Sequence, residues 1–404
     1  MSMETRSLGL LSQTPRIRRP VSDAELKRRW GATRALMDKM GIDLVLTQGN
    51  NMFLGGYVRW FTDIPAEYNF HMTVLFPKEG DMTLIRTSGS KIPEWGLRGV
   101  GEVCYAPFSP SISYTGGAEA RPAIEYIRKT GAKRIGYIGP ALINSGFFTR
   151  VLAEFPKAEF IEITDEFDLI KAIKSPEEME LVREAARIQD SFFSALPAIV
   201  KPNMYEYQIR AAAIKLLMDL GSEEHLIFLG TNEPGKPCGM ATFQYANRMM
   251  NDGDYGTILI EVSGPGGIYC ESARNFCFGE PYPAMQKAWD FAVEAQRFTA
   301  DMLTPGRPAS EIVEKYNILV KERGYSQEGR LYGHSQGYDL IERPAFMAAN
   351  PEGCETMRIQ AGMNISLHPY FIDHEQTVYI NDNFYVSERG AERIHKTPPE
   401  IILL

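Results

Sequence analysis

The sequence predicts an α+β protein in which an N-terminal α/β domain precedes a C-terminal domain built on a long antiparallel sheet. In the first half of the chain, short apolar runs that suit strands alternate with segments of helical periodicity. A strong helix start at residues 175–178 opens the second half, where strands dominate from residue 225 onward. We therefore expect two domains, over residues 1–167 and 168–404.

The alternation in the first half predicts a mixed sheet with helices beside it. Ser22 is a good N-cap residue, and Gly41 ends the helical pattern that follows it. Lys78-Glu79-Gly80-Asp81 is a turn sequence between two apolar runs, which predicts a hairpin. The expected elements are a helix at 26–40, strands at 42–48 and on both sides of the turn within 71–88, a helix at 118–129, and strands at 134–139 and 160–165.

The second half begins with Ser175-Pro176-Glu177-Glu178, which favours a helix start. Serine accepts hydrogen bonds from the first free N–H groups, proline fits the first helical position, and Glu178 can bond back to the cap. The expected elements are helices at about 176–197, 205–220, 284–303 and 309–323, strands within 225–280, and strands with glycine-rich turns over 330–404. Helices outside a long antiparallel sheet complete an α+β domain.

The composition excludes several classes of partner. The chain has 404 residues, a net charge of −8 and no block of basic residues, so we expect no nucleic-acid partner. It has no run of 18 apolar residues, so no membrane partner is expected either. Its five cysteines form no CxxC pair, which in a chain of this length favours reduced thiols and a cytoplasmic location.

Two glutamates lie within apolar strand sequence. Glu261 follows Ile258-Leu259-Ile260, and the turn Gly264-Pro265-Gly266-Gly267 folds the next strand back, which brings Glu271 near it. An unpaired charge is costly to bury, so each carboxylate should face a cavity or a partner. Two carboxylates that lie close together share a cation or raise one pKa. The alternative is that both face solvent at the rim of the sheet.

Further polar residues interrupt the strands of the last third. His334 stands between glycines, and His368 ends the strand 364–367, just before Pro369 and Tyr370. Asp382, preceded by Asn381, interrupts another apolar run. A lone histidine is usually structural, but imidazole also titrates near neutral pH and binds metals. Four other histidines are given no role: His374, which lies in a charged loop and should be exposed, and His71, His225 and His395.

The order and spacing of these segments resemble the superfamily of creatinase, prolidase, aminopeptidase P and methionine aminopeptidase. The resemblance covers nearly the whole chain and implies a creatinase-like N-terminal domain and a pita-bread domain that opens at Lys174-Ser175-Pro176. Peptidases of this group bind two metal ions through two aspartates, a histidine and two glutamates. By resemblance, the matching positions here are Glu261, Glu271, His334, His368 and either Asn381 or Asp382.

The departures from the peptidase pattern suggest a change of chemistry. Both aspartates are glutamates here, one glutamate is His368, and the last position reads as Asn381, a poor ligand for a divalent ion. Two histidines that the peptidases use on the substrate are absent, near Pro237–Cys238 and at Ile341. The stretch Glu261-Val262-Ser263-Gly264, with Arg274 on the return strand, resembles ectoine hydrolases, which work without metal as creatinase does.

These features lead us to expect a hydrolase that cleaves a non-peptide C–N bond, of amidine, guanidine or cyclic amide type, in a small polar metabolite. No metal or other cofactor is expected. Glu261 would be the nucleophile or the base, His334 and His368 would pass protons, and Glu271 would stabilise a developing cation.

Five residues are expected to contact the substrate: Tyr370, Arg274, Arg59, Trp60 and Phe61. Arg274 has the alternative role of pairing with Glu271 as a structural support. By resemblance to creatinase-like homodimers, residues 57–71 would cover the site of a second subunit. The alternative is that these aromatic side chains pack inside their own domain.

Two other functions stay open. Glu261, Glu271, His334, His368 and Asp382 are all able to bind zinc, manganese or iron, which would make the chain an Xaa-Pro peptidase-like enzyme or a lyase acting on a small zwitterion. Some pita-bread proteins are catalytically inactive and bind protein partners, but acidic and imidazole residues at the pocket positions argue against this. Metal analysis of the purified protein separates the metalloenzyme from the metal-free hydrolase.

Overall fold

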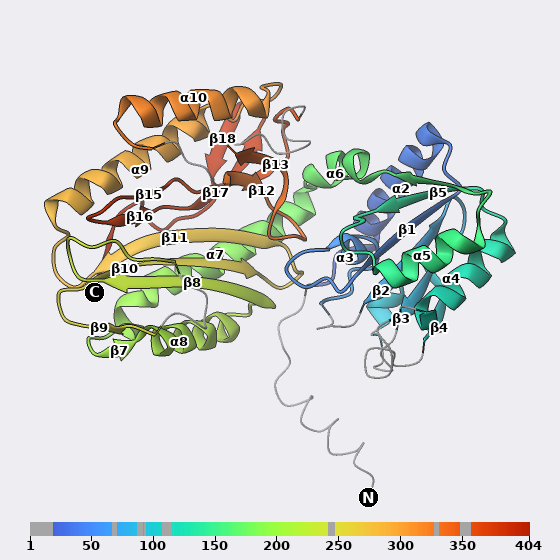
Figure 1. Ribbon diagram of the computed structural model, residues 1–404, viewed down its shortest axis with the longest axis horizontal. Coiled ribbons are helices and arrows are strands. Elements are labelled where there is room, and N and C mark those ends of the chain that lie inside the picture. Colours follow the sequence, from blue (N-terminus) through green and yellow to red (C-terminus); the bar gives the residue numbers. More distant parts are fainter. Residues whose placement is uncertain are drawn as a thin grey trace, which may run out of the picture.

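The computed structural model of the protein describes residues 19–66, 71–86, 92, 94–106, 115, 117–240, 247–326, 331–347 and 357–404. Two sheet-containing bodies lie side by side and are joined through α6 (Thr164–Ala172) and α7 (Pro176–Ile199) (Figure 1). The predicted α+β class is confirmed. None of the helices in these ranges is long and apolar enough to cross a membrane.

The N-terminal body is a mixed six-stranded sheet with helices packed beside it. Its strand order is β4-β3-β2-β1-β5-β6, and β1 pairs antiparallel with β2 and parallel with β5. Every residue of β1 is buried, as expected for a central strand that is covered on both faces. The elements are α2 (Asp23–Met40), β1 (Leu44–Gly49), α3 (Tyr57–Thr62), β2 (Met72–Pro77), β3 (Met82–Arg86), η1 (Glu94–Leu97), β4 (Val100–Tyr105), α4 (Gly117–Thr130), β5 (Arg134–Ile138), α5 (Ser145–Glu154) and β6 (Glu159–Glu162).

The C-terminal body contains two larger sheets, with strand orders β19-β11-β10-β8 and β13-β12-β14-β17-β18. The two long central strands of the first sheet, β10 and β11, are buried along their whole length. The elements are β7 (Met204–Tyr205), α8 (Glu206–Asp219), β8 (Glu224–Asn232), β9 (Met249–Met250), β10 (Tyr255–Ser263), β11 (Tyr269–Cys277), α9 (Pro283–Asp301), α10 (Ala309–Glu322), β12 (Leu331–Ser335), β13 (Glu342–Met347), β14 (Asn364–Leu367), β15 (Tyr370–Ile372), β16 (Thr377–Tyr379), β17 (Asp382–Ser387), β18 (Gly390–Arg393) and β19 (Ile402–Leu403).

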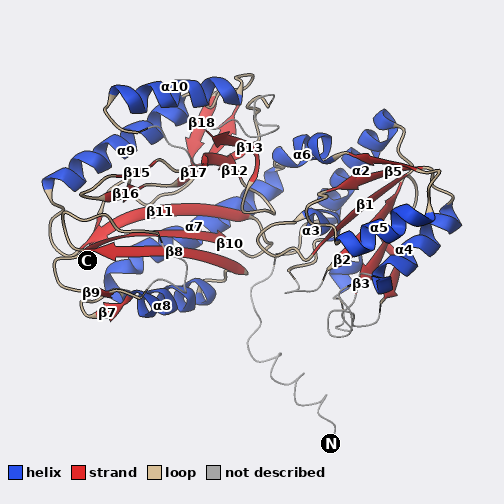
Figure 2. Cartoon of the chain, in the orientation of Figure 1, coloured by secondary structure: helices blue, strands red, loops and turns tan. Residues whose placement is uncertain are grey.

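Helices cover the outer faces of the two sheets, and the inner faces of the sheets are turned toward each other. α7 packs on β10 and β11, and α8 packs on β8, while α9 and α10 contact strands of the other sheet and the β15–β16 hairpin (Figure 2). The sheets meet where Ala273 of β11 bridges to Asn381, just ahead of β17. Side chains from β11, β12, β14 and β17 can therefore converge.

The start of α7 has the predicted capping geometry and is also fixed to the N-terminal body. The side chain of Ser175 accepts from Glu178 N–H at 3.1 Å, and the Glu178 carboxylate accepts from Ser175 N–H at 2.8 Å. The same carboxylate lies 2.9 Å from the Arg29 guanidinium of α2. Burial of both partners makes this ion pair a fixed joint between the two bodies.

Helices α5 and α6 are among those that lie where no helix was predicted. Asn144 caps α5 by accepting from the N–H groups of Gly146 and Phe147. The predicted strand 160–165 is wrong in its second half, because β6 ends at Glu162 and α6 begins at Thr164.

The aromatic segment at 57–62 forms α3 and packs inside its own chain. Trp60 and Phe61 are 1% and 0% exposed, and their rings lie 4.9 and 5.6 Å from the ring of Phe167. Arg59 is also buried, with Nη1 2.7 Å from Glu223 of the C-terminal body. These contacts favour the alternative, in which the three residues pack inside their own chain, and their contact with the substrate of a second subunit stays a prediction.

Residues 67–70 of the same segment lie outside the described residues. The homodimer itself stays a prediction.

Candidate metal centre

Glu261 and Glu271 face each other across β10 and β11. They are direct partners in the antiparallel register, so their side chains share one face of the sheet, and they are 8% and 3% exposed. Oε2 of Glu261 is buried and has no hydrogen-bond partner in the part of the chain that the structure describes. The glycine-rich turn at 264–267 thus brings the two carboxylates together as the sequence predicts, and they do not face solvent.

Two histidines from the other sheet approach Glu271. His334 lies on β12 and His368 follows β14, and both are buried. One ligand atom from each of Glu271, His334 and His368 lies within 4.8 Å of the other two. The two imidazole rings meet edge to face, with their centroids 5.1 Å apart. These are three of the four residues that the sequence singles out as catalytic.

The hydrogen bonds of His334 indicate that a cation belongs between it and Glu271. Its Nδ1 lies 2.9 Å from the carbonyl oxygen of Ser335, which can only accept, so Nδ1 carries a proton. Its Nε2 lies 3.2 Å from Oε2 of Glu271, which is an acceptor when ionised. Two lone pairs at that distance repel each other unless a proton or a metal ion lies between them. The Nδ1 hydrogen bond to a carbonyl is the arrangement that orients metal-binding histidines.

Neighbouring groups hold Glu271 in its ionised form. Burial raises the pKa of this carboxyl, but His368, His334 and Ser366 more than offset that effect, and its pKa lies below the usual range. The hydroxyl of Ser366 lies 3.1 Å from Oε2 of Glu271, and the hydroxyl of Tyr379 lies 3.5 Å from Oε1. By contrast, burial and then the charge of Glu271 raise the pKa of Glu261 well above its usual range. The two carboxyls therefore have different protonation behaviour.

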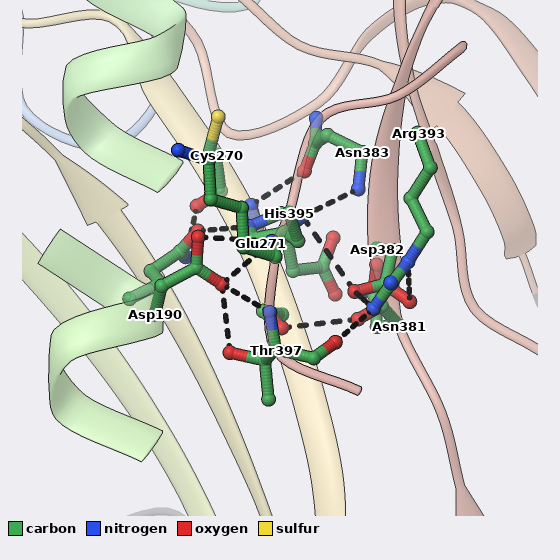
Figure 3. Close-up of polar contacts among 12 residues, drawn as sticks. Asp190, Cys270, Glu271, Asn381, Asp382, Asn383, Arg393, His395 and Thr397 are labelled. Atoms are coloured by element: carbon green, nitrogen blue, oxygen red, sulfur yellow. Dashed lines mark hydrogen bonds and ion pairs between the residues drawn. The ribbon is translucent and has the colours of Figure 1, made fainter. Parts of the chain in front are cut away.

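Asp382 and Arg274 pair with each other and are not part of the group of Glu271, His334 and His368. Nη2 of Arg274 lies 2.8 Å from Oδ1 of Asp382, and Nε of Arg393 lies 3.0 Å from Oδ2 (Figure 3). Asn381, one residue earlier, points to the site instead, with Oδ1 accepting from Ser366 at 2.8 Å. The structure therefore corrects two expectations: Asp382 is not available as a ligand, and Arg274 supports the fold but pairs with Asp382, not with Glu271 or a substrate.

A buried chain of hydrogen bonds lies behind the two glutamates. Nε2 of Gln189, on α7, donates to the carbonyl oxygens of Ile260 and Cys270 at 2.8 Å each. These are the residues immediately before Glu261 and Glu271, so a single amide fixes both strands at the site.

His395 extends this chain, although the sequence analysis gave it no role. Its Nε2 lies 2.7 Å from Oε1 of Gln189, and its Nδ1 accepts from the N–H of Asn383 at 3.0 Å (Figure 3). Asn383 in turn accepts from the N–H of Glu271 at 2.8 Å. No sequence signal links these residues, because Gln189 and His395 are 206 residues apart.

Tyr370 stands next to the site, in an apolar group on the same face of the sheet. The ring of Tyr379 lies 5.4 Å from that of Tyr370 and 6.0 Å from that of His368. Leu259 and Ala273, which share the face of Glu261 and Glu271, pack with Tyr379, Tyr370, Phe228 and Met240. The contact of Tyr370 with a substrate stays a prediction.

The residues present fit one divalent metal ion. Two imidazole nitrogens and one carboxylate match catalytic zinc sites of the His₂Glu kind and the two-histidine, one-carboxylate sites of non-haem iron. Both leave a coordination position open for water or substrate. The close approach of Nε2 of His334 to Oε2 of Glu271, which requires a proton or a metal ion between the two atoms, is compatible with this fit.

Comparison with known proteins identifies the family. The model of metallopeptidase family M24 matches residues 180–388. An uncharacterized peptidase of Bacillus subtilis, YqhT, is 23% identical over 297 residues, which cover 72% of this chain and 80% of the relative. The Xaa-Pro dipeptidase of Pyrococcus furiosus is 25% identical over 250 residues, or 60% of this chain and 69% of the relative. Among solved structures, an X-Pro aminopeptidase from Thermotoga maritima gives a TM-score of 0.77 at 18% identity, covering 93% of this chain and 99% of that chain.

These matches confirm the predicted superfamily and pita-bread fold, and they overturn the expected function. The prediction of a metal-independent hydrolase for amidine, guanidine or cyclic amide bonds is wrong, because the matching family is one of metallopeptidases and the named relatives are peptidases. The expectation of no metal is corrected with it, since Glu271, His334 and His368 form a group that suits a divalent ion. The chain belongs to metallopeptidase family M24.

Proposed function

We propose that this protein is a divalent-metal-dependent hydrolase that cleaves the peptide bond of Xaa-Pro dipeptides. The observation that carries the proposal is the buried group of Glu271, His334 and His368, in which Nε2 of His334 and Oε2 of Glu271 face each other at 3.2 Å. The Xaa-Pro dipeptidases among the relatives support the reaction type.

The three donors would hold the metal, and neighbouring groups fix two of them in place. Glu271 is held by its backbone N–H bond to Asn383, and His334 by the carbonyl oxygen of Ser335. A divalent ion in this position supplies Lewis-acid catalysis: it polarises a carbonyl oxygen and lowers the pKa of water.

Glu261 is the residue that we assign to proton transfer. It lies directly opposite Glu271, its Oε2 is buried without a hydrogen-bond partner in the described ranges, and it is not part of the group of three donors. Peptide hydrolysis requires a base that removes a proton from water and an acid that protonates the leaving nitrogen. A carboxylate beside the metal donors can perform both steps in turn.

The apolar group beside the site supports a substrate with a compact apolar ring. Leu259 and Phe228 lie on the same face as the glutamates, and Tyr370 and Tyr379 of the β15–β16 hairpin pack against them. Apolar walls with a few placed polar groups are usual in small-molecule sites. Cys238 and Ile341 stand near or at the positions where the resemblance places substrate-binding histidines, so we expect the aromatic surface to carry more of the binding here.

The test is cleavage of Xaa-Pro dipeptides by purified protein that has been stripped of metal and reloaded with Zn²⁺, Mn²⁺ or Fe²⁺ in separate samples. We expect activity only in reloaded samples, loss on chelation, and loss in His368→Gln and in Glu261→Gln. The variants should differ in one respect: Glu261→Gln still binds metal, whereas His368→Gln does not. The control is His374→Gln, because that side chain is 90% exposed and is not one of the proposed metal donors.

Cleavage that survives chelation would contradict the metal dependence. Metal-loaded protein that leaves every Xaa-Pro dipeptide intact would contradict the substrate class. The cytoplasmic location and the homodimer expected from the sequence belong to the same proposal, and size-exclusion chromatography with light scattering tests the dimer.

A further inference from the structure

We propose that this centre holds a single divalent ion, where the resemblance to two-metal peptidases implies a pair; this inference rests on the metal dependence proposed above. It concerns the number of ions, which neither the fold nor the family membership determines.

Charge balance is the first argument. The five positions that the resemblance assigns to metal binding carry four carboxylates in the peptidases, which match the four positive charges of two divalent ions. Here the positions that face the site are Glu261, Glu271, His334, His368 and Asn381, with two carboxylates among them. Even with both carboxylates ionised, they neutralise only one divalent ion, and a second ion would leave at least two uncompensated positive charges in a buried site, which is very costly.

The second argument is the pairing of Asp382. It is the nearest carboxylate in sequence that would restore the missing charge, but it is 0% exposed and lies between the guanidinium groups of Arg274 and Arg393. Moving it into the site would leave the fully buried Arg274 without its partner. The side chain that takes its place is the Asn381 amide. Its oxygen already accepts from Ser366, and its Nδ2 has no hydrogen-bond acceptor within the described residues.

Donor geometry is the third argument. A two-metal centre needs donors that bridge ions about 3.5–4 Å apart. Within the described residues, the donors that lie within 4.8 Å of one another are those of Glu271, His334 and His368 alone. Glu261 is outside this group, so the arrangement is compact around one point.

The experiment counts ions. Metal-free protein is titrated with Mn²⁺ by calorimetry, and bound Mn²⁺ is measured by elemental analysis after dialysis and by electron paramagnetic resonance. We expect one equivalent per chain and the spectrum of an isolated Mn²⁺ ion. Glu271→Gln should weaken binding by more than about 100-fold, since changes outside the ligand shell already cost about 10–100-fold. His374→Gln should bind like the wild type.

Asn381→Asp provides the decisive variant, because it returns one negative charge with almost no change of shape. We expect it to take up a second, weaker equivalent of Mn²⁺, with a spectrum that shows coupling between two ions. Two equivalents with coupled spectra in the wild type would overturn the single-ion inference and leave the proposed function intact. A stoichiometry of one in Asn381→Asp would overturn the charge argument, and no binding in the wild type would overturn both proposals.

Discussion

Mild acid should destabilise the folded protein through one buried imidazole, that of His395. Burial lowers the pKa of His395 from 6.5 to about 4, and the nearby charge of Asp382, 3.7 Å away, offsets only part of that effect. In its hydrogen-bonded position the ring must be neutral, because Nδ1 accepts from the N–H of Asn383. Between the two pKa values the unfolded chain binds a proton that the folded chain does not, so stability is complete above pH 6.5 and falls as the pH falls toward 4.

The loss of stability depends on how far the pH lies between the two pKa values of His395. Each pH unit inside the window removes about 1.4 kcal/mol from the free energy of unfolding. Between pH 6.5 and pH 5 the loss from His395 alone is therefore about 2 kcal/mol, a large share of the stability of a typical domain.

The assay is urea unfolding, followed by fluorescence, at several pH values from 7.5 to 5 for the wild type, His395→Gln and His374→Gln. His395→Gln should be less stable than the wild type at pH 7.5, because it disturbs the bonds to Gln189 and Asn383. Its stability should nevertheless fall less on acidification, by about 2 kcal/mol. The exposed His374 is the control and should keep the wild-type dependence. An undiminished acid loss in His395→Gln would refute the argument.

Two further predictions concern packing. Gly267→Ala should lower the free energy of unfolding by at least about 2 kcal/mol, since φ is +80° and the new Cβ would lie 1.9 Å from Cζ of Arg59, which holds Glu223. Gly235→Ala is its control, because φ is +82° there but nothing lies within 4 Å, and a comparable loss in both variants would show that the Arg59 contact is unimportant. Trp60→Ala should cost about 3–5 kcal/mol by leaving a cavity against Phe167. A variant of unchanged stability but raised KM for an Xaa-Pro dipeptide would instead place Trp60 at the substrate.

Local sequence was enough to predict the pairing of Glu261 with Glu271, because a four-residue turn fixes the register of the two strands around it. The same holds for the start of α7, where cap, proline and glutamate are adjacent in the chain. His334 and His368 were recognisable as polar interruptions of strands, and the resemblance supplied their roles.

Long-range contacts decided the remaining residues, and the sequence carries no pattern for them. The resemblance places the fifth ligand position at Asn381 or Asp382, and only the pairing of Asp382 with Arg274, 108 residues away, decides between them. The aromatic residues of α3 suit a pocket or a core, and only the position of Phe167 settles that they are core. The sequence predicts the wrong function because its altered ligands suggest the loss of a metal site, although the imidazole of His368 replaces one donor with another.

The ion pairs between the two bodies affect whether the C-terminal body can fold without the N-terminal body. Glu178 and Glu223 of the C-terminal body have Arg29 and Arg59 of the N-terminal body as their guanidinium partners, and Asp339 accepts from the N–H of Gly56 at 2.8 Å. If residues 168–404 were produced without the preceding part, these acceptors would lose their donors, and the first turn of α7 would lose its anchor. We therefore expect the two bodies to fold together, although the family model matches residues 180–388 alone.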